Sequence, residues 1–257
     1  MKFLQSLSAQ VSLRTQGAIL ALGLLFIILD ALTEPMNPAI DLAWVTVIIC
    51  GLPLLINSVQ SILDHLEIHA NFLIVIAMVA LIAIGDYHTA AYVGLIVHGG
   101  FFLEQLITGD VHYTLDDDML PTMPTQLVAL RQGINNYSSV IVVAVMLLSM
   151  GSYALTQNFM HTITLLVILC PCSLELVLVA LMMGSLVDEN SPTAGLSKDA
   201  KQCHLGLLIV SILFHVVIIG AGVLGSINPV TAAALHGLAR LGLVYNLKVL
   251  NSSLCIA

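Results

Sequence analysis

Long apolar runs, separated by short polar stretches, constrain the fold of this chain more than any other feature of its sequence. They lie near residues 17–33, 42–63, 70–85, 87–107, 137–156, 159–185, 202–223 and 230–250. A helix needs ~20 mostly apolar residues to cross the hydrocarbon core of a bilayer. The pattern therefore predicts an all-α integral membrane protein, a polytopic bundle of about eight transmembrane helices.

Charged residues are scarce, which agrees with a membrane environment. Only 9% of the 257 residues are charged and 59% are hydrophobic, whereas about a quarter of the residues of a soluble domain are charged. Most of the surface must therefore face lipid or another protein, and membrane lipid is the first expected partner. The formal net charge is -8, and no basic stretch suggests a nucleic-acid partner.

The whole chain, 1–257, is interpreted as a single transmembrane domain. The two longest polar stretches, 108–136 and 186–201, are predicted to be short cytoplasmic loops. Both are smaller than the ~50 residues of a small independent domain. Asp116, Asp117 and Asp118 make the first loop acidic; it is either a solvated loop or a vestibule that attracts cations.

Basic residues indicate the orientation of the bundle. An even number of spans brings both termini to the same side of the membrane. Apart from Arg240, every Lys and Arg falls on that side, namely Lys2, Arg14, Arg131, Lys198, Lys201 and Lys248. The opposite side carries Glu34, Asp41 and Asp86. Because cytoplasmic loops are enriched in Lys and Arg, the N- and C-termini are predicted to be cytoplasmic.

The second apolar run contains a proline and ends in a polar stretch. Pro53 is expected to kink or break the helix, because it removes a backbone donor. The residues that follow form an amphipathic pattern, typical of a short helix lying along the inner membrane surface. Within it, His65 and His69 share a helix face and could hold a metal with Asp64 or Glu67. A polar interfacial stripe is the competing interpretation.

Cys170-Pro171-Cys172, inside the sixth run, carries the most chemical information. Pro171 is expected to open the helix and free backbone carbonyls, which is tolerated in a membrane only inside protein or beside a cavity. Two thiols on either side of the opening suit Cu(I), Zn(II) and similar ions. The spacing is equally compatible with a kinked packing helix that buries two thiols.

Several other motifs occur in the order and spacing of a known membrane domain. They are Asn71–Met78, Gly85–Ala91, Phe102–Glu104, Leu120–Gly133 and Asn228–Leu250. With Cys170-Pro171-Cys172, they resemble the membrane domain of the heavy-metal (soft-metal) P-type ATPases over nearly the whole chain. The break at Pro53 resembles that family's kinked second helix, and Leu120–Gly133 resembles the segment leading into its actuator domain.

The resemblance implies a transition-metal site. Cys170 and Cys172 would be soft ligands, and His236 stands where the family places a metal ligand. Glu104 would complete or feed the site. The stretch Asp64–His69 would receive the ion at the inner face of the membrane. Cu(I) and Zn(II) both remain compatible with these residues.

The soluble machinery of that family is missing from the sequence. The DKTGT and TGE motifs are absent, and no room for phosphorylation and nucleotide-binding domains exists between Leu186 and Lys201. The chain resembles a pump that lacks its actuator, phosphorylation and nucleotide-binding domains. We therefore expect no enzyme activity and no ATP site. A separate protein subunit that hydrolyses ATP, or a metal chaperone, would be a partner; passive ion movement is the other possibility.

Two charges depart from the family pattern. Glu175 follows the Cys170-Pro171-Cys172 motif, and Arg240 lies one helical turn after His236. An arginine inside a membrane is costly and needs a partner, and Glu104 and Glu175 are the candidates. A Glu175–Arg240 pair would cancel both charges and leave the thiol site intact. An Arg240 in the ion path would instead repel cations.

Two functional hypotheses follow. The first is a transition-metal-binding membrane protein without its own ATPase machinery. The alternative is a non-transporting structural or regulatory subunit that reuses the pump fold in a membrane complex.

Among the other histidines, His98 and His215 are expected to lie well inside the membrane. The glycines at 99–100, 220 and 222 offer small surfaces for helix contact.

Overall fold

A computed structural model describes residues 13–33, 42–65, 71–108, 125–170 and 198–255. All secondary structure in these ranges is helical. The helices are α2 (Leu13–Thr33), α3 (Ala43–His65), α4 (Asn71–Ala83), α5 (Tyr87–Thr108), α6 (Thr125–Thr156), α7 (Phe159–Ile168), α9 (Lys198–Val223) and α10 (Pro229–Cys255). The predicted all-α fold is confirmed for the described part of the chain.

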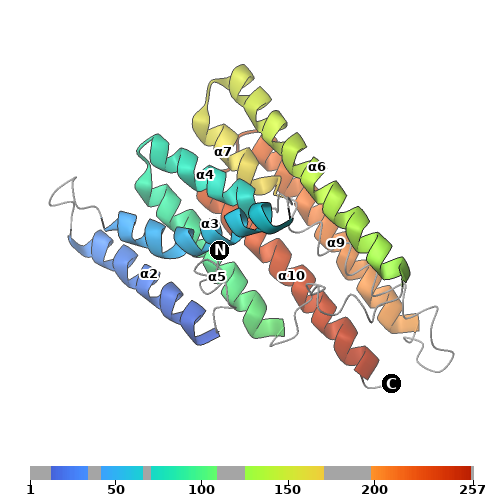
Figure 1. Ribbon diagram of the computed structural model, residues 1–257. Helices are drawn as coiled ribbons and strands as arrows, with labels where there is room; N and C mark the ends of the chain where they lie inside the picture. The colour runs from blue at the N-terminus through green and yellow to red at the C-terminus, as the bar shows by residue number, and fades with distance from the viewer. Residues whose placement is uncertain (1–12, 34–41, 66–70, 109–124, 171–197, 256–257) are drawn as a thin grey trace.

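Helix α10 joins two groups of helices (Figure 1). On one side it packs against α5, which also contacts α2, α3 and α4. On the other side it packs against α7 and α9, and α6 packs against α7. The long helices α6, α9 and α10 run along the same diagonal of Figure 1. Residues on the α5-facing and α9-facing sides of α10 therefore lie at the centre of the bundle.

Most helix bounds agree with the apolar runs, but α6 is an exception. It begins at Thr125, so residues 125–136, expected to belong to the loop 108–136, are helical. Likewise, α9 begins at Lys198 rather than near 202. Polarity marks where a helix leaves an apolar environment, whereas residues such as Gln126 and Leu130 are good helix formers whatever surrounds them.

Helix α3 is not broken by its proline. It runs without interruption from Ala43 to His65 with Pro53 inside it, so the predicted break at Pro53 is absent. A single proline removes one backbone hydrogen bond, and a helix can continue beyond it when its neighbours hold it in place. The residues after Pro53 are the second half of α3 rather than a separate helix.

Helix α7 ends where the sequence predicts an opening. The Asn158 side chain caps its first turn by accepting the backbone N–H of His161 at 3.2 Å. The helix ends at Ile168, and the Leu169 N–H donates to the Leu165 carbonyl at 2.9 Å. The residue before a proline disfavours helical backbone, which accounts for an end just before Pro171. The remainder of the predicted run, 171–185, lies outside the described residues.

Glycines allow close helix packing at specific points. The Thr46 hydroxyl donates to the Gly23 carbonyl at 3.2 Å, which joins α3 to α2. A Cβ atom on Gly23 would lie 3.0 Å from both the Cys50 sulfur and Leu95. Gly222 of α9 approaches Ile168 so closely that its Cβ would lie 2.6 Å away. This contact fits the small helix surface expected at this position.

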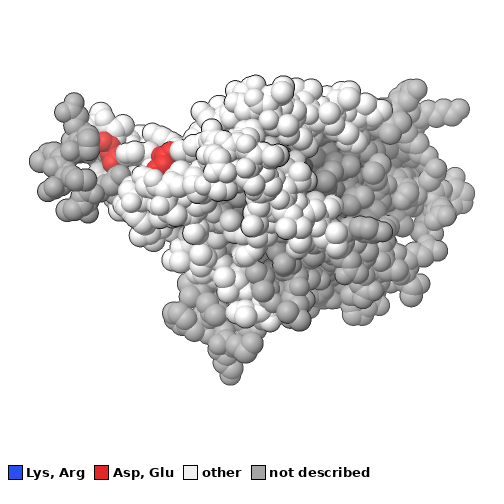
Figure 2. Space-filling view, turned by 90° about the horizontal axis from the view of Figure 1, so that it is seen from above, with Lys and Arg blue, Asp and Glu red and all other residues white. Residues whose placement is uncertain are grey.

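Large apolar side chains lie both in the core of the described bundle and on its outside. The core is mostly apolar, and its buried polar side chains are those of Thr46, Ser58, His98, Ser149, Thr164 and His236. Large apolar side chains also cover the outside of α2, α6 and α9, and Leu155 is 88% exposed. Figure 2 shows one face of the molecule. On that face the described residues show acidic atoms near one edge and no Lys or Arg.

Two helices are long and apolar enough to cross a membrane. They cover Leu13–Leu32 in α2 and Tyr87–Ile107 in α5. Shorter apolar helices occur at Ala43–Ile56, Phe72–Ala83, Val140–Thr156, Phe159–Ile168 and Ile209–Val223. These findings concern length and composition of the described residues alone.

Candidate functional site

A charged pair lies between α5 and α10. The Arg240 Nε atom is 2.9 Å from a carboxylate oxygen of Glu104, and the two side chains are 18% and 20% exposed. The Arg240 guanidinium carbon also lies 4.5 Å from the centre of the Phe101 ring. Phe101 and Glu104 are about one helical turn apart, so both reach Arg240 from α5. The carboxylate neutralises the arginine, and the ring face adds a cation–π contact.

This pair answers the expectation that Arg240 needs a partner. The structure shows Glu104 in that role, while Glu175 lies outside the described residues. A carboxylate that balances a guanidinium is a poorer ligand for a second cation. Glu104 is the counter-charge of Arg240 in the described structure, and its predicted part in a metal site stays a prediction.

Two imidazoles meet beside this pair, at the contact between α9 and α10. His236 is 6% exposed, and its ring centre lies 6.1 Å from that of His215, with the planes at 88°. The His215 Nδ1 atom lies 2.9 Å from the Ser211 carbonyl oxygen. Because a carbonyl can only accept, Nδ1 carries the proton, and in the neutral ring the lone pair is on Nε2. His236 and Arg240 are four residues apart and share one face of α10.

Cys170 lies just beyond the end of α7. Its side chain is 3% exposed, and it belongs to the hydrophobic core. The helix that precedes it packs against α10, which carries His236. Cys172, its partner in the predicted thiol site, lies outside the described residues. Within the described ranges no three His, Cys, Asp or Glu side chains are grouped to hold a metal ion.

The predicted platform at the inner face is only partly described. Asp64 and His65 form the end of α3. Glu67 and His69 lie outside the described residues, so the proposed pairing of His65 with His69 stays a prediction.

The opposite end of the bundle carries contacts that the sequence did not single out. His88 Nδ1 lies 3.2 Å from an Asp30 carboxylate oxygen, which joins the start of α5 to the end of α2. The rings of Trp44 and Tyr87 are 4.7 Å apart. A second aromatic pair, Tyr153 and Phe159, stands where α6 meets α7, with ring centres 4.3 Å apart. The shared signal is position beside the connection between two runs: Asp30 and Tyr153 lie near the end of their helices, and the other four residues lie near the start of theirs.

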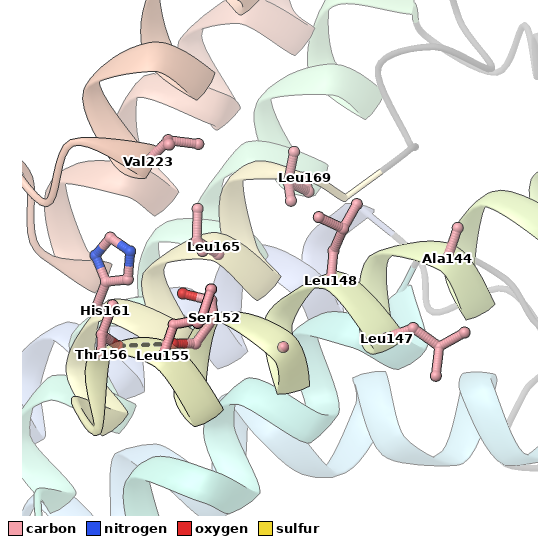
Figure 3. Close-up of a pocket in the computed structure, with 11 residues that line it drawn as sticks. Ala144, Leu147, Leu148, Ser152, Leu155, Thr156, His161, Leu165, Leu169 and Val223 are labelled. Carbon is pink, nitrogen blue, oxygen red and sulfur yellow. Dashed lines mark hydrogen bonds between the residues drawn. The ribbon is translucent and has the colours of Figure 1, made fainter.

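An open apolar groove of about 760 Å³ lies beside α6 and α7 (Figure 3). Leu148 of α6, Leu165 of α7 and Val223 of α9 contribute to its lining. Its polar lining residues are Ser152, Thr156 and His161, and the Thr156 hydroxyl donates to the Ser152 carbonyl at 2.8 Å. The groove is separate from the charged pair and offers no cluster of catalytic groups.

Comparisons of the chain with models of known protein families, with curated proteins and with solved structures found no match.

Proposed function

We propose that this chain is a multi-pass membrane protein whose helix bundle binds a soft transition-metal ion for transport, without ATPase machinery of its own. The observation that carries the proposal is a buried thiol, Cys170, and a buried imidazole, His236, in a mostly apolar interior. Thiol and imidazole together suit Cu(I) or Zn(II). The resemblance of Cys170-Pro171-Cys172 to the heavy-metal P-type ATPases supplies Cys172 as the next ligand.

The large apolar side chains on the outside of the bundle support the membrane part of this proposal. Exposing large apolar side chains such as Leu155, Leu224 and Val217 to water would be unfavourable. In lipid those side chains are solvated, and the costly groups are the polar ones, which are buried here. Local thinning of the bilayer accommodates apolar helices that are shorter than the hydrocarbon core is thick.

Residues at the two ends of the helices support an orientation. The aromatic pairs Trp44–Tyr87 and Tyr153–Phe159 stand at one end of the bundle, typical of a membrane interface. Arg14 lies in the first turn of α2, at the opposite end. This is the end where the positive-inside rule puts the cytoplasm, so the proposal has both termini on the cytoplasmic side.

The neutral charged pair supports a cation site nearby. An isolated Arg240, one turn from His236, would repel any cation bound there. The Glu104 carboxylate at 2.9 Å cancels that charge. His236 can therefore serve as a ligand even though Arg240 lies on the same face of α10.

Metal content tests the proposal directly. Elemental mass spectrometry on detergent-purified protein should find about one soft-metal ion per chain, and the double variant Cys170→Ser/Cys172→Ser should lose it. Cys50→Ser is the matched control, because Cys50 is also buried but lies in α3 against α2. An unchanged metal content in the double variant would sink the proposal, provided the Cys50 control retains its metal.

A second candidate is a non-transporting structural or regulatory subunit. The observation that favours it is the engagement of Glu104 by Arg240, which removes one carboxylate from the ligands implied by the resemblance. This candidate predicts a metal-free protein that stays attached to a larger complex in mild detergent. A metal-loaded monomer from native membranes would contradict it.

A further inference from the structure

We infer that water molecules occupy the contact between α2 and α5 and bridge the side chains of Gln16, His98 and Gln105. This hydrated site goes beyond the proposed function, because it needs no metal ion and uses none of the residues assigned to the metal site. Water suits such a place because one molecule can both donate and accept hydrogen bonds between groups that do not touch.

The α5 side of the site is a single helix face that points at α2. His98, Phe102 and Gln105 follow one another at spacings of four and three residues, so their side chains share this face. Phe102 shows where the face points, because its ring lies 3.3 Å from the position of a Cβ atom on Gly17 of α2. His98 and Gln105 therefore flank a direct contact between the two helices.

The α2 side of the site carries Gln16. Gln16 and Leu20 are four residues apart and share a face, and Leu20 lies 3.5 Å from the position of a Cβ atom on Gly99 of α5. The His98 imidazole also lies beside the backbone of Gln16. Gln16 is therefore opposite the α5 face that carries His98 and Gln105.

All three residues bury polar atoms that make no hydrogen bond. The His98 side chain is only 5% exposed. Among the described residues, neither ring nitrogen of His98 nor the Oε1 atoms of Gln16 and Gln105 has a hydrogen-bond partner. A neutral imidazole offers one donor and one acceptor, and an amide oxygen only accepts. Because nearly all buried polar groups of native proteins pair with protein or with ordered water, these atoms call for a ligand.

Water fits these groups better than direct contacts or a metal ion. The two amide oxygens cannot bond each other, because both are acceptors. His98 and Gln105 are two turns apart, ~10 Å along the helix axis, which is more than one hydrogen bond can span. A buried water typically makes about three hydrogen bonds to groups that would otherwise be unsatisfied. The three side chains supply no carboxylate or thiolate to balance the charge of a metal ion.

The position of the residues gives water a way in. Gln16 lies near the start of α2, and Gln105 lies near the end of α5. Both therefore stand toward the same end of the α2–α5 contact, and His98 lies further inside. In the proposed orientation this is the cytoplasmic end, so the site would be filled from the cytoplasm.

His98→Phe tests the inference, because phenylalanine keeps a planar ring but has no polar atom. If water bridges the site, the bound water and the two amide oxygens lose partners, and the equilibrium constant for unfolding should rise roughly 5–150-fold. If the ring nitrogens make no hydrogen bond at all, an apolar ring should be neutral or stabilising. The measurement is a denaturant titration of the full chain in mixed micelles. Stability equal to or above that of the wild type would overturn the inference.

Ser149→Ala is the matched control. The Ser149 hydroxyl is also buried without a partner among the residues described, but it lies on α6, outside the α2–α5 contact. Its removal should leave the unfolding equilibrium unchanged or favour the folded state. A loss confined to His98→Phe supports the water site, whereas equal losses in the two variants overturn it.

A second measurement uses the unmodified protein and does not depend on a variant that folds. A short X-ray pulse turns bound water into hydroxyl radicals that label adjacent side chains, and mass spectrometry should find the label on His98 or Phe102 despite their position between helices. Met78, which is 3% exposed in the apolar core, should stay unlabelled. Absence of label from both His98 and Phe102, while the exposed His88 is labelled, would overturn the inference. The proposed function would be unaffected, because neither measurement involves a metal.

Discussion

Two helix contacts in this bundle bury polar atoms in different ways. Where α2 meets α3, the buried groups are neutral, and the Thr46 hydroxyl bonds the Gly23 carbonyl of the neighbouring helix at 3.2 Å. Where α5 meets α10, the buried groups carry charge, and Arg240 requires both Glu104 and the Phe101 ring. A neutral hydroxyl finds an acceptor on almost any backbone, whereas a buried charge needs one particular partner. The first contact serves packing, and the second restricts what the centre of the bundle can bind.

Breaking the charged pair should give the largest effect. Arg240→Met leaves the Glu104 carboxylate without its counter-charge, and removing one member of a buried pair typically costs about 3–5 kcal/mol. The measurement is thermal unfolding of the detergent-solubilised protein. The double variant Glu104→Leu/Arg240→Met should recover most of the lost stability, because no lone charge is left. A double variant no more stable than Arg240→Met would contradict the assignment of this pair.

Crowding the neutral contact should give a medium effect. Gly23→Val places side-chain atoms against the Cys50 sulfur and Leu95, which already lie 3.0 Å from a Cβ at this position. Overpacking of this kind costs about 1–3 kcal/mol. The control is Gly237→Val on α10, where a Cβ meets nothing within 4 Å. Equal melting temperatures for the two variants would mean that α2 does not pack closely against α3 and α5.

Removing the aromatic face beside Arg240 should give the smallest effect. Phe101→Leu keeps an apolar side chain at the site but removes the ring that lies 4.5 Å from the guanidinium carbon. The expected loss is about 0.5–2 kcal/mol. Measuring it in the wild type and in the Glu104→Leu/Arg240→Met background isolates the interaction with the charge. A loss of the same size in both backgrounds would show that the ring contributes packing alone.

The positions of most helices could be predicted from the sequence because each lies in an apolar run about as long as a helix, and polar stretches separate these runs. The start of α6 could not, since apolar content falls near residue 137 while the helix begins at Thr125. Likewise, a kink or break was expected at Pro53, and α3 does not break there: it is continuous from Ala43 to His65. In both places local composition was read as a helix boundary. Residues such as Gln126 and Leu130 are good helix formers whatever surrounds them, and a helix can continue beyond a single proline when its neighbours hold it in place.

The sequence predicted which types of residue the candidate site contains better than it predicted how those residues are arranged. Burial of an arginine requires a carboxylate, so the need for Glu104 or Glu175 follows from the sequence. The use of Glu104 depends on how α5 packs against α10, which no periodicity reveals. The proximity of His215 to His236 has the same origin, because each histidine alone looks like an ordinary polar residue in its own apolar run.

The length of α6 has a mechanical consequence. Its 32 residues form an unbroken rod of ~48 Å, well beyond the ~30 Å of a bilayer's hydrocarbon core. In the proposed orientation, the part of α6 that is longer than the hydrocarbon core projects on the cytoplasmic side. No break in the helix separates it from the part inside the membrane. Spin labels at Val128 and Leu155 should stand ~40 Å apart; a much shorter or broad distance would reveal a hinge. A rigid lever would carry any push or twist by a cytoplasmic partner directly to the far end, where Tyr153 packs on Phe159.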